Sequence, residues 1–188
     1  MTIDMFKQSR ACADPMLVKA MNLAITTGQR RGDILKMKFS DVKDGFLQVI
    51  QSKVRDKDRP DAEARASKVR IPLGLHVAAL NLTLGSAIAN CRDNIISKAM
   101  IHHIRHQGRA KPGARIRDKT IEQLFRDARS AAGIAGPNAP TFHEIRSLAA
   151  RLLEAQGVDV KALLGHKSEQ MAALYQDVRG AEGQTIHI

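Results

Sequence analysis

The chain has 188 residues, enough for one domain whose hydrophobic core needs neither disulfides nor a structural metal. Hydrophobic residues make up 44% of it, which excludes a disordered basic tail, and the 3% of aromatic residues indicates a core of aliphatic side chains packed between helices. Lys and Arg outnumber Asp and Glu by 30 to 19, giving a net charge of +11. This excess of positive charge favours a polyanionic partner, and nucleic acid is the usual one.

The cysteine content and the hydropathy pattern bear on the compartment. Cys12 and Cys91 do not form a disulfide framework, and the further cysteines of a zinc site are missing. The first ten residues contain no apolar segment of a signal peptide, and no run of 18 apolar residues occurs. We therefore expect a soluble, cytoplasmic protein with reduced thiols and no membrane association.

Apolar residues recur at helical spacing along most of the chain. The predicted helices cover residues 15–27, 31–37, 75–90 and 142–155. Three more are predicted: one after Asp118 that bears Ile121, Leu124, Phe125 and Ala128, a short one between Asp159 and Gly165, and one that starts at Ser168 and reaches past Tyr175. Gly28 and Gly165 end two of these helices, and Asp118, Asp159 and Ser168 are predicted as N-caps.

Two strands are predicted between the second and third helices. Asp44-Gly45 is a turn signal, and apolar and polar residues alternate over 46–51 behind it. A partner strand is predicted over 69–73, and the charged segment 54–67 between the two is predicted to be a long hairpin loop. A third strand is predicted over 94–101. The fold class is therefore α+β and mostly helical, a single domain with a small antiparallel sheet.

The segment Thr141-Phe-His-Glu144 is a capping-box pattern and places a histidine and an arginine on one helix face. His143 falls in the first turn, where the helix dipole disfavours its protonated form, and Arg146 follows three residues later. A neutral imidazole beside a guanidinium suits a phosphate with a proton to move. A solvated surface pair has the same spacing.

Two further clusters carry reactive side chains. Arg30 sits just beyond a predicted helix end, with Arg31 and Asp33 close by. His166 follows a helix-ending glycine, and Tyr175 lies on the next predicted helix. A half-buried core tyrosine would show the same helical spacing as Tyr175.

Taken in chain order, the motifs TGQRRGD, QSK after a strand, TFHEIR, LLGH and a tyrosine nine residues later resemble the tyrosine recombinases, in particular the lambdoid phage integrases. The resemblance runs from about residue 11 to the C-terminus. It implies a tyrosine recombinase catalytic-domain fold over residues 1–188, without the N-terminal core-binding and arm-binding domains of full integrases. It also implies that the tail, residues 177–188, packs as a strand on its own or a neighbouring protomer.

The resemblance also implies a role for each motif residue. The residues that would surround the scissile phosphate are Arg30, His143, Arg146 and His166. Lys53 matches the general acid that protonates the leaving 5′-hydroxyl, Tyr175 matches the nucleophile, and Asp33 matches an acidic residue that supports the cations from behind. Lys57 and Lys68 remain rival acids, and Arg31 is a rival for Arg30.

The chemistry of a phosphodiester agrees with this set of side chains. Under attack, the non-bridging oxygens gain negative charge, which arginine and imidazole groups stabilise more in the transition state than in the ground state. A tyrosine with a pKa near 10 needs a base or nearby cations, and His143 is the candidate base. No metal or other cofactor is expected, because protein side chains supply the cations.

Residues 102–117 are basic and contain glycine, which predicts a loop that contacts the DNA backbone. The candidate DNA-binding residues are Arg31, Lys57, His103, Arg105, Arg109 and Lys111. A metal site at His102, His103 and His106 is the rival interpretation of this loop, although no carboxylate accompanies them.

The resemblance implies site-specific recombination in phage integration and excision, through a 3′-phosphotyrosine intermediate. The expected partners are double-stranded DNA attachment sites, a synaptic homotetramer and accessory DNA-bending proteins, in the cytoplasm of a bacterial host and at the nucleoid when DNA is bound. Alone, the chain is expected to be monomeric and to bind DNA weakly and in a salt-sensitive way. The alternatives are a catalytically inert DNA-binding remnant of an integrase and a basic RNA-binding protein.

Overall fold

Helix α2 (Pro15–Thr27) lies at the centre of the molecule, and ten of its 13 residues are buried. It begins where the Asp14 side chain accepts a hydrogen bond from the Leu17 N–H (2.7 Å), and it ends at Gly28, whose φ of 62° is left-handed. The computed structural model describes residues 1–51, 67–165 and 184–185. The predicted helix over 15–27 is confirmed.

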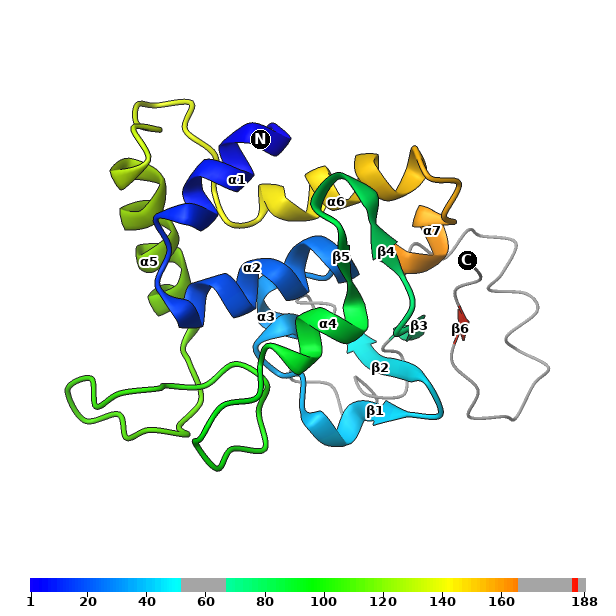
Figure 1. The fold of residues 1–188 in the computed structure, drawn as a ribbon, viewed down its shortest axis with the longest axis horizontal. Helices are drawn as coiled ribbons and strands as arrows, with labels where there is room; N and C mark the ends of the chain where they lie inside the picture. The colour runs from blue at the N-terminus through cyan, green and yellow to red at the C-terminus, as the bar shows by residue number, and fades with distance from the viewer. Residues whose placement is uncertain (52–66, 166–183, 186–188) are drawn as a thin grey trace, which may run out of the picture.

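The other helices surround α2 (Figure 1). They are α1 (Ile3–Ala11), α3 (Arg31–Ile34), α4 (Leu84–Ala89), α5 (Asp118–Ala131), α6 (Glu144–Glu154) and α7 (Val160–Leu164), with the short 3-10 turns η1 (Phe39–Asp41) and η3 (Ala78–Leu80). Helices α4 and α6 pack on α2, and α1 packs on α5. The mostly helical, aliphatic core that the composition predicts is confirmed.

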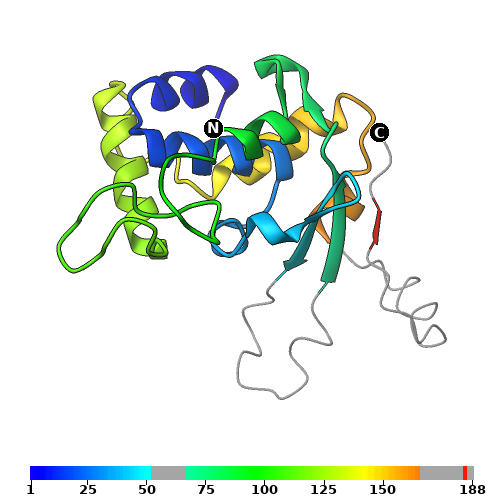
Figure 2. The ribbon, with the colours of Figure 1, turned by 60° about the horizontal axis from the view of Figure 1, so that its bottom comes forward.

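A four-stranded sheet lies at one end of this helical body, with β6 beside β3 (Figure 2). Its strands run in the order β1 (Val42–Lys43), β2 (Phe46–Gln51), β3 (Ser67–Pro72) and β6 (Gln184–Thr185). The pairs β1–β2 and β2–β3 are antiparallel as predicted, whereas β6 runs parallel to β3. Asp44 and Gly45 make the predicted turn with φ values of 50° and 78°.

Strand β2 alternates between the core and the solvent. Leu47, Val49 and Gln51 are buried, whereas Gln48 and Ile50 are exposed. Helix α7 contacts the neighbouring strand β3. The buried face of the sheet therefore brings a polar side chain, that of Gln51, to the junction with the helices.

Two predicted elements are wrong. The single helix over 75–90 is instead the small hairpin of β4 (His76–Val77) and β5 (Leu82–Thr83) around η3, followed by the much shorter α4. Asn81 takes a left-handed conformation (φ 46°) in that hairpin, and the Thr83 hydroxyl accepts from the Ser86 N–H (3.1 Å) to start α4. The predicted strand over 94–101 has only an isolated bridge, between Ala99 and Lys38.

Several boundaries differ by a few residues, and one helix was not predicted. Helix α3 ends at Ile34, α5 begins at Asp118 with Arg117 as its cap, and α6 begins two residues later than predicted. Helix α1 had no counterpart in the prediction. Residues 54–66 of the predicted loop and the helix predicted from Ser168 lie outside the described residues. In the part of the chain that the structure describes, none of the helices has the length and apolar character to span a membrane.

Candidate active site

A cleft of about 590 Å³ opens where α3, the start of α5 and the start of α6 meet. Its basic lining consists of Arg30, Arg31, Lys36, Arg115 and His143. Acidic side chains line it too, namely Asp33, Asp118 and Glu122. Positive side chains from three segments far apart in the sequence therefore face one cavity, which suits an anion.

Arg30 reaches the cleft from the junction of α2 and α3. Gly28 turns the chain out of α2, and Arg30 then occupies the N-cap position of α3 with extended dihedrals (φ −67°, ψ 148°). Arg30 is half-buried. The position between two helix ends fixes the backbone from which the guanidinium extends into the cleft.

His143 reaches the cleft from the start of α6, where it is exposed and occupies the N-cap position. The turn before it is closed by the Glu144 carboxylate, which accepts from the Thr141 N–H (3.0 Å), so this half of the predicted capping box is present. The Arg146 N–H donates to the His143 carbonyl (3.1 Å). His143 precedes the helix instead of lying in its first turn, and it is exposed whereas Arg146 is buried, so the predicted pairing of the two side chains stays a prediction.

Arg146 is buried and held by two helix ends. Its guanidinium donates to the Gly28 carbonyl (2.6 Å) at the end of α2 and to the Leu164 carbonyl (3.0 Å) at the end of α7. Burial and then the nearby Arg30 guanidinium lower the pKa of Arg146 to about 10, while the Asp33 carboxylate opposes the shift. Arg146 therefore remains a cation at neutral pH, in a fixed orientation beside Arg30.

Asp33 lines the cleft together with Arg30 and is only 3% exposed. Its negative charge favours the charged form of Arg146. The supporting role that the resemblance implies for Asp33 stays a prediction. Arg30, Asp33, His143 and Arg146 are thus brought together, whereas Lys53, Lys57, His166 and Tyr175 lie outside the described residues.

Arg31, the rival for Arg30, and Lys68, a rival general acid, both lie within the described residues. Arg31 forms ion pairs with Asp118 (3.8 Å) and Glu122 of α5 at the edge of the cleft. Lys68 is exposed on β3, opposite Ile50 and on the face of the sheet away from Gln51. Arg31 therefore joins α3 to α5, and Arg30 is the arginine beside Arg146.

The segment 102–117 has no helix or strand beyond isolated bridges, as predicted for a loop. Arg105, Arg109 and Lys111 are exposed on it. His103 is instead buried, and burial followed by the neighbouring His102 lowers its pKa. His103 is therefore neutral at neutral pH and covered, which does not suit a phosphate contact.

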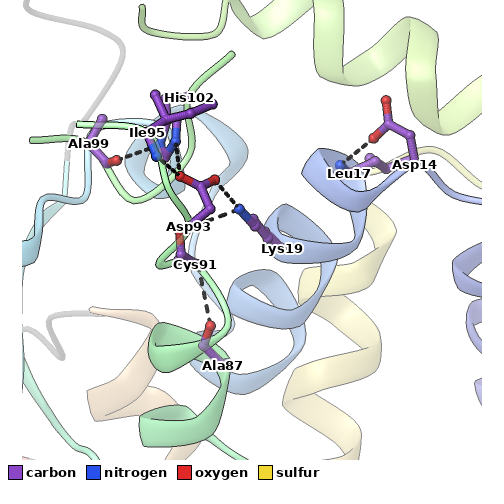
Figure 3. A network of polar contacts seen from close by, with 9 residues as sticks. All are labelled: Asp14, Leu17, Lys19, Ala87, Cys91, Asp93, Ile95, Ala99 and His102. Atoms are coloured by element: carbon purple, nitrogen blue, oxygen red, sulfur yellow. Dashed lines mark hydrogen bonds and ion pairs between the residues drawn. The ribbon is translucent and has the colours of Figure 1, made fainter. Parts of the chain in front are cut away.

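At the rival metal site, the His102 ring contacts protein groups on both of its nitrogens (Figure 3). The His102 ring lies between the Ala99 carbonyl (3.0 Å from Nδ1) and the Asp93 carboxylate (3.2 Å from Nε2), and Lys19 also contacts Asp93 (2.6 Å). Among residues 1–51 and 67–165, no group of three His, Cys, Asp or Glu side chains is placed to hold a metal ion. In the described residues, His102 therefore has a structural role: through Asp93 and Lys19 it connects the loop to α2.

Three residues at or near the cleft were missed as candidates. Arg115 lines it and donates to the Leu35 carbonyl (3.4 Å). Gln29, next to Arg30 in the chain, and Gln51 are buried and hydrogen-bond to each other (2.6 Å). Both glutamines stand in the motifs TGQRRGD and QSK, so their positions beside Arg30 and Lys53 were the available signal.

An arginine and an exposed histidine line one cleft, and a buried arginine lies beside the first, within a mostly helical α+β domain. The model of the phage integrase family matches residues 4–182. The integrase of Enterobacteria phage P21 is 41% identical over 176 residues, which are 93% of this chain and 43% of that protein. The chain belongs to the phage integrase family.

Solved structures agree with this assignment. The lambda integrase catalytic core matches with a TM-score of 0.78 and 34% identity, over 100% of this chain and 98% of that one. A lambda integrase tetramer bound to a Holliday junction matches with a TM-score of 0.74 and 35% identity, over 97% of this chain and 49% of that one. The chain spans less than half the length of the phage P21 relative that it matches.

Proposed function

We propose that this chain cuts and rejoins DNA strands in site-specific recombination, with Tyr175 as the nucleophile. The observation that carries the proposal is the shared cleft: Arg30 and His143 line it, and Arg146 lies beside Arg30. Membership of the phage integrase family supports it. The substrate class is double-stranded DNA at phage attachment sites, in the cytoplasm of a bacterial host and at its nucleoid.

In the proposed step, the Tyr175 oxygen attacks the scissile phosphorus and the bond from phosphorus to the 5′-oxygen breaks. His143 takes the phenolic proton, and Lys53 gives a proton to the leaving 5′-oxygen. Arg30, Arg146 and His166 stabilise the charge that develops on the non-bridging oxygens. The 3′-phosphotyrosine bond retains the energy of the phosphodiester, so an incoming 5′-hydroxyl can reverse the step without ATP.

The remaining assignments are part of the same proposal. Asp33 supports the arginines, and Arg105, Arg109 and Lys111 contact the DNA backbone. The chain acts within a synaptic homotetramer together with accessory DNA-bending proteins, and is monomeric alone. The known tetramer of lambda integrase on a Holliday junction supports the assembly.

A nicked suicide DNA site tests the proposal, because release of a short strand traps the covalent complex. We expect the wild type to form a protein–DNA adduct in the presence of EDTA and Tyr175→Phe to form none. The chain contains a single tyrosine, so peptide mapping of the adduct is unambiguous. Arg146→Met should lower the rate by about 10²–10³-fold, as for other preorganised donors.

The control is Phe142→Tyr, which adds a second phenol near the cleft without supplying the nucleophile. It should form its adduct only at Tyr175. An adduct that persists in Tyr175→Phe would move the nucleophile elsewhere. A wild type that binds DNA, forms no adduct and does not relax supercoiled plasmid would instead be an inert remnant.

A further inference from the structure

Two buried glutamines, Gln29 and Gln51, form a hydrogen-bonded pair. Gln29 is 1% exposed at the α2–α3 junction, and Gln51 is 2% exposed at the end of β2. The Gln51 Nε2 donates to Gln29 Oε1 (2.6 Å), and both Nε2 groups donate to the Leu163 carbonyl of α7, at 2.8 Å from Gln29 and 3.3 Å from Gln51. Three segments are thus joined by side-chain amides.

The orientation of each amide is determined by its neighbours. The Leu163 and Thr27 carbonyls can only accept, so the nitrogen of Gln29 must face them (2.8 and 3.1 Å). Its oxygen is then left to accept from Gln51. Because only one arrangement satisfies these groups, the pair fixes the relative position of β2, α7 and the end of α2.

The pair sits next to the residues of the proposed reaction in the chain. Gln29 directly precedes Arg30, and Gln51 precedes Lys53 by two residues. Arg146 is bound to Gly28 and Leu164, the residues adjacent to Gln29 and Leu163. The hydrogen bonds of the glutamine pair and those of Arg146 therefore alternate along the same two segments.

The pair is also in tight contact with the turn before His166. A Cβ atom at Gly165 would lie 2.7 Å from Gln51 Cδ, so the amide packs directly against this glycine. A buried polar pair is costly unless it is satisfied, and an apolar pair would fill the same volume without directional bonds. Directional bonds are what a site needs when a displacement of about 1 Å costs about 10²-fold in rate.

We propose that Gln29 and Gln51 are positioning residues for DNA cleavage, which hold the end of β2 in register with the phosphate-binding arginines so that Lys53 can protonate the leaving group. The inference rests on the proposed function. Gln51 is the last residue of β2 and precedes Lys53 by two residues, so holding Gln51 holds the point from which the segment with Lys53 begins. Gln29 anchors Gln51 to the segment that carries Arg30.

The test compares two suicide substrates that differ at one atom. One carries the natural 5′-oxygen at the scissile phosphate, and the other carries sulfur there. A thiolate leaves without a proton, so its departure does not need a general acid. We expect Gln51→Met to slow cleavage of the oxygen substrate by about 10–100-fold and to leave cleavage of the sulfur substrate within about threefold of the wild type.

Matched variants make the pattern specific. Gln48→Met changes the same residue type on the exposed face of the same strand and should cleave both substrates like the wild type. Lys53→Ala should show the same preference for sulfur as Gln51→Met. Gln29→Met should show it more weakly, and the double variant should be no slower than the slower single variant, because the two residues act as a unit. Gln51→Asn, which keeps the amide but shortens it, replaces Gln51→Met if that variant does not fold.

Equal losses on the oxygen and sulfur substrates would overturn the inference, since they would indicate a general loss of folded enzyme. Oxygen cleavage at the wild-type rate in Gln51→Met would overturn it as well. In both cases the proposed function stands, because the wild type still forms its adduct. A wild type that forms no adduct on either substrate would contradict the proposed function itself.

Discussion

Arg146 shows how a buried guanidinium is kept both charged and oriented. Two carbonyls at helix C-termini accept its hydrogen bonds, and the negative ends of helix dipoles favour a cation at such positions. Asp33 and Arg30 act on the pKa of Arg146 in opposite directions, because the carboxylate favours the charged guanidinium and the second guanidinium disfavours it. A lysine could not make both hydrogen bonds from one planar group.

Gly165 gives a test of the packing at single-residue resolution. Gly165→Ala should destabilise the protein by about 1–2 kcal/mol from the left-handed backbone (φ 65°) and by about 1–3 kcal/mol more from the collision with Gln51. Urea denaturation measures the free energy of unfolding. The same substitution should slow formation of the covalent DNA adduct, because it displaces Gln51.

The control for Gly165→Ala is Gly157→Ala. Gly157 has a similar backbone (φ 82°), but an added Cβ would have no atom within 4 Å. It should lose about 1–2 kcal/mol and keep its cleavage rate. Equal losses for the two variants would show that Gln51 does not pack against Gly165 as described.

The residues with reactive side chains could be predicted from the sequence, whereas those that hold them could not. Arg30, Asp33, His143 and Arg146 stand in recognisable motifs and meet in the structure. The partner of Gln29 and Gln51 is the carbonyl of Leu163, which is 134 and 112 residues away in the chain. A backbone carbonyl has no sequence signature, so a contact of this kind becomes visible only in the fold.

At the scale of elements, periodicity was reliable for long helices and misleading for short segments. The helical spacing over 75–90 arises because a two-stranded hairpin and a six-residue helix both face the same core, through Val77, Leu84 and Ile88. The predicted strand over 94–101 buries Ala99 to Ile101 but pairs with no strand. Burial alone produced both apolar patterns.

The contact between α3 and α5 leads to a prediction on DNA affinity. Arg31 is held by Asp118 and Glu122, so two carboxylates offset part of the basic lining at the edge of the cleft. Glu122→Gln should release Arg31 and remove a repulsive charge. Fluorescence anisotropy with a labelled duplex should then show tighter binding and a salt dependence steeper by about 0.9, equivalent to one added phosphate contact.

Asp127→Asn is the control for Glu122→Gln, since Asp127 lies on the same helix and hydrogen-bonds to Gln123 instead. It should leave the salt dependence unchanged. Stability should change by less than about 1 kcal/mol in both variants, because these carboxylates are largely exposed. An unchanged salt dependence in Glu122→Gln would mean that Arg31 stays away from DNA even when it is released.

Asp93 joins the segment after α4 to α2 and makes stability depend on pH (Figure 3). Burial raises its pKa, but hydrogen bonds from Lys19, the Ile95 N–H and His102 outweigh burial, so the pKa lies below 3.8. A lowered carboxyl pKa stabilises the fold above the unfolded value and is lost as the pH falls through the folded value. Asp93→Asn should therefore cost about 1–2 kcal/mol at pH 7 and progressively less below pH 4.

Urea denaturation of the wild type and of Asp93→Asn, from pH 7 to below pH 4, measures the difference in the free energy of unfolding. Asp44→Asn serves as the control, because Asp44 occupies an exposed left-handed turn position that asparagine also tolerates. Its effect should be small at every pH. A gap between the wild type and Asp93→Asn that widens on acidification would contradict the sign of the shift.

At the scale of the whole molecule, the net charge of +11 leads to a prediction about the proposed binding of DNA. Binding by counterion release predicts that the affinity for a duplex of arbitrary sequence falls by about 10³-fold between 50 and 200 mM salt if about six phosphates are contacted. Anisotropy titrations at several salt concentrations measure this slope. Tight binding of one DNA sequence that does not weaken with salt would contradict it.

The parallel pairing of β6 with β3 has a consequence for Tyr175, the proposed nucleophile. Gly165 ends α7 and Gln184 begins β6, and both belong to the folded body, so the eighteen residues between them are tethered at both ends. Tyr175 stands near the midpoint of that tether, ten residues from one anchor and nine from the other. The contour length of each arm, at most about 3.6 Å per residue, bounds the volume in which the phenol can be found and hence its effective molarity at a bound phosphate.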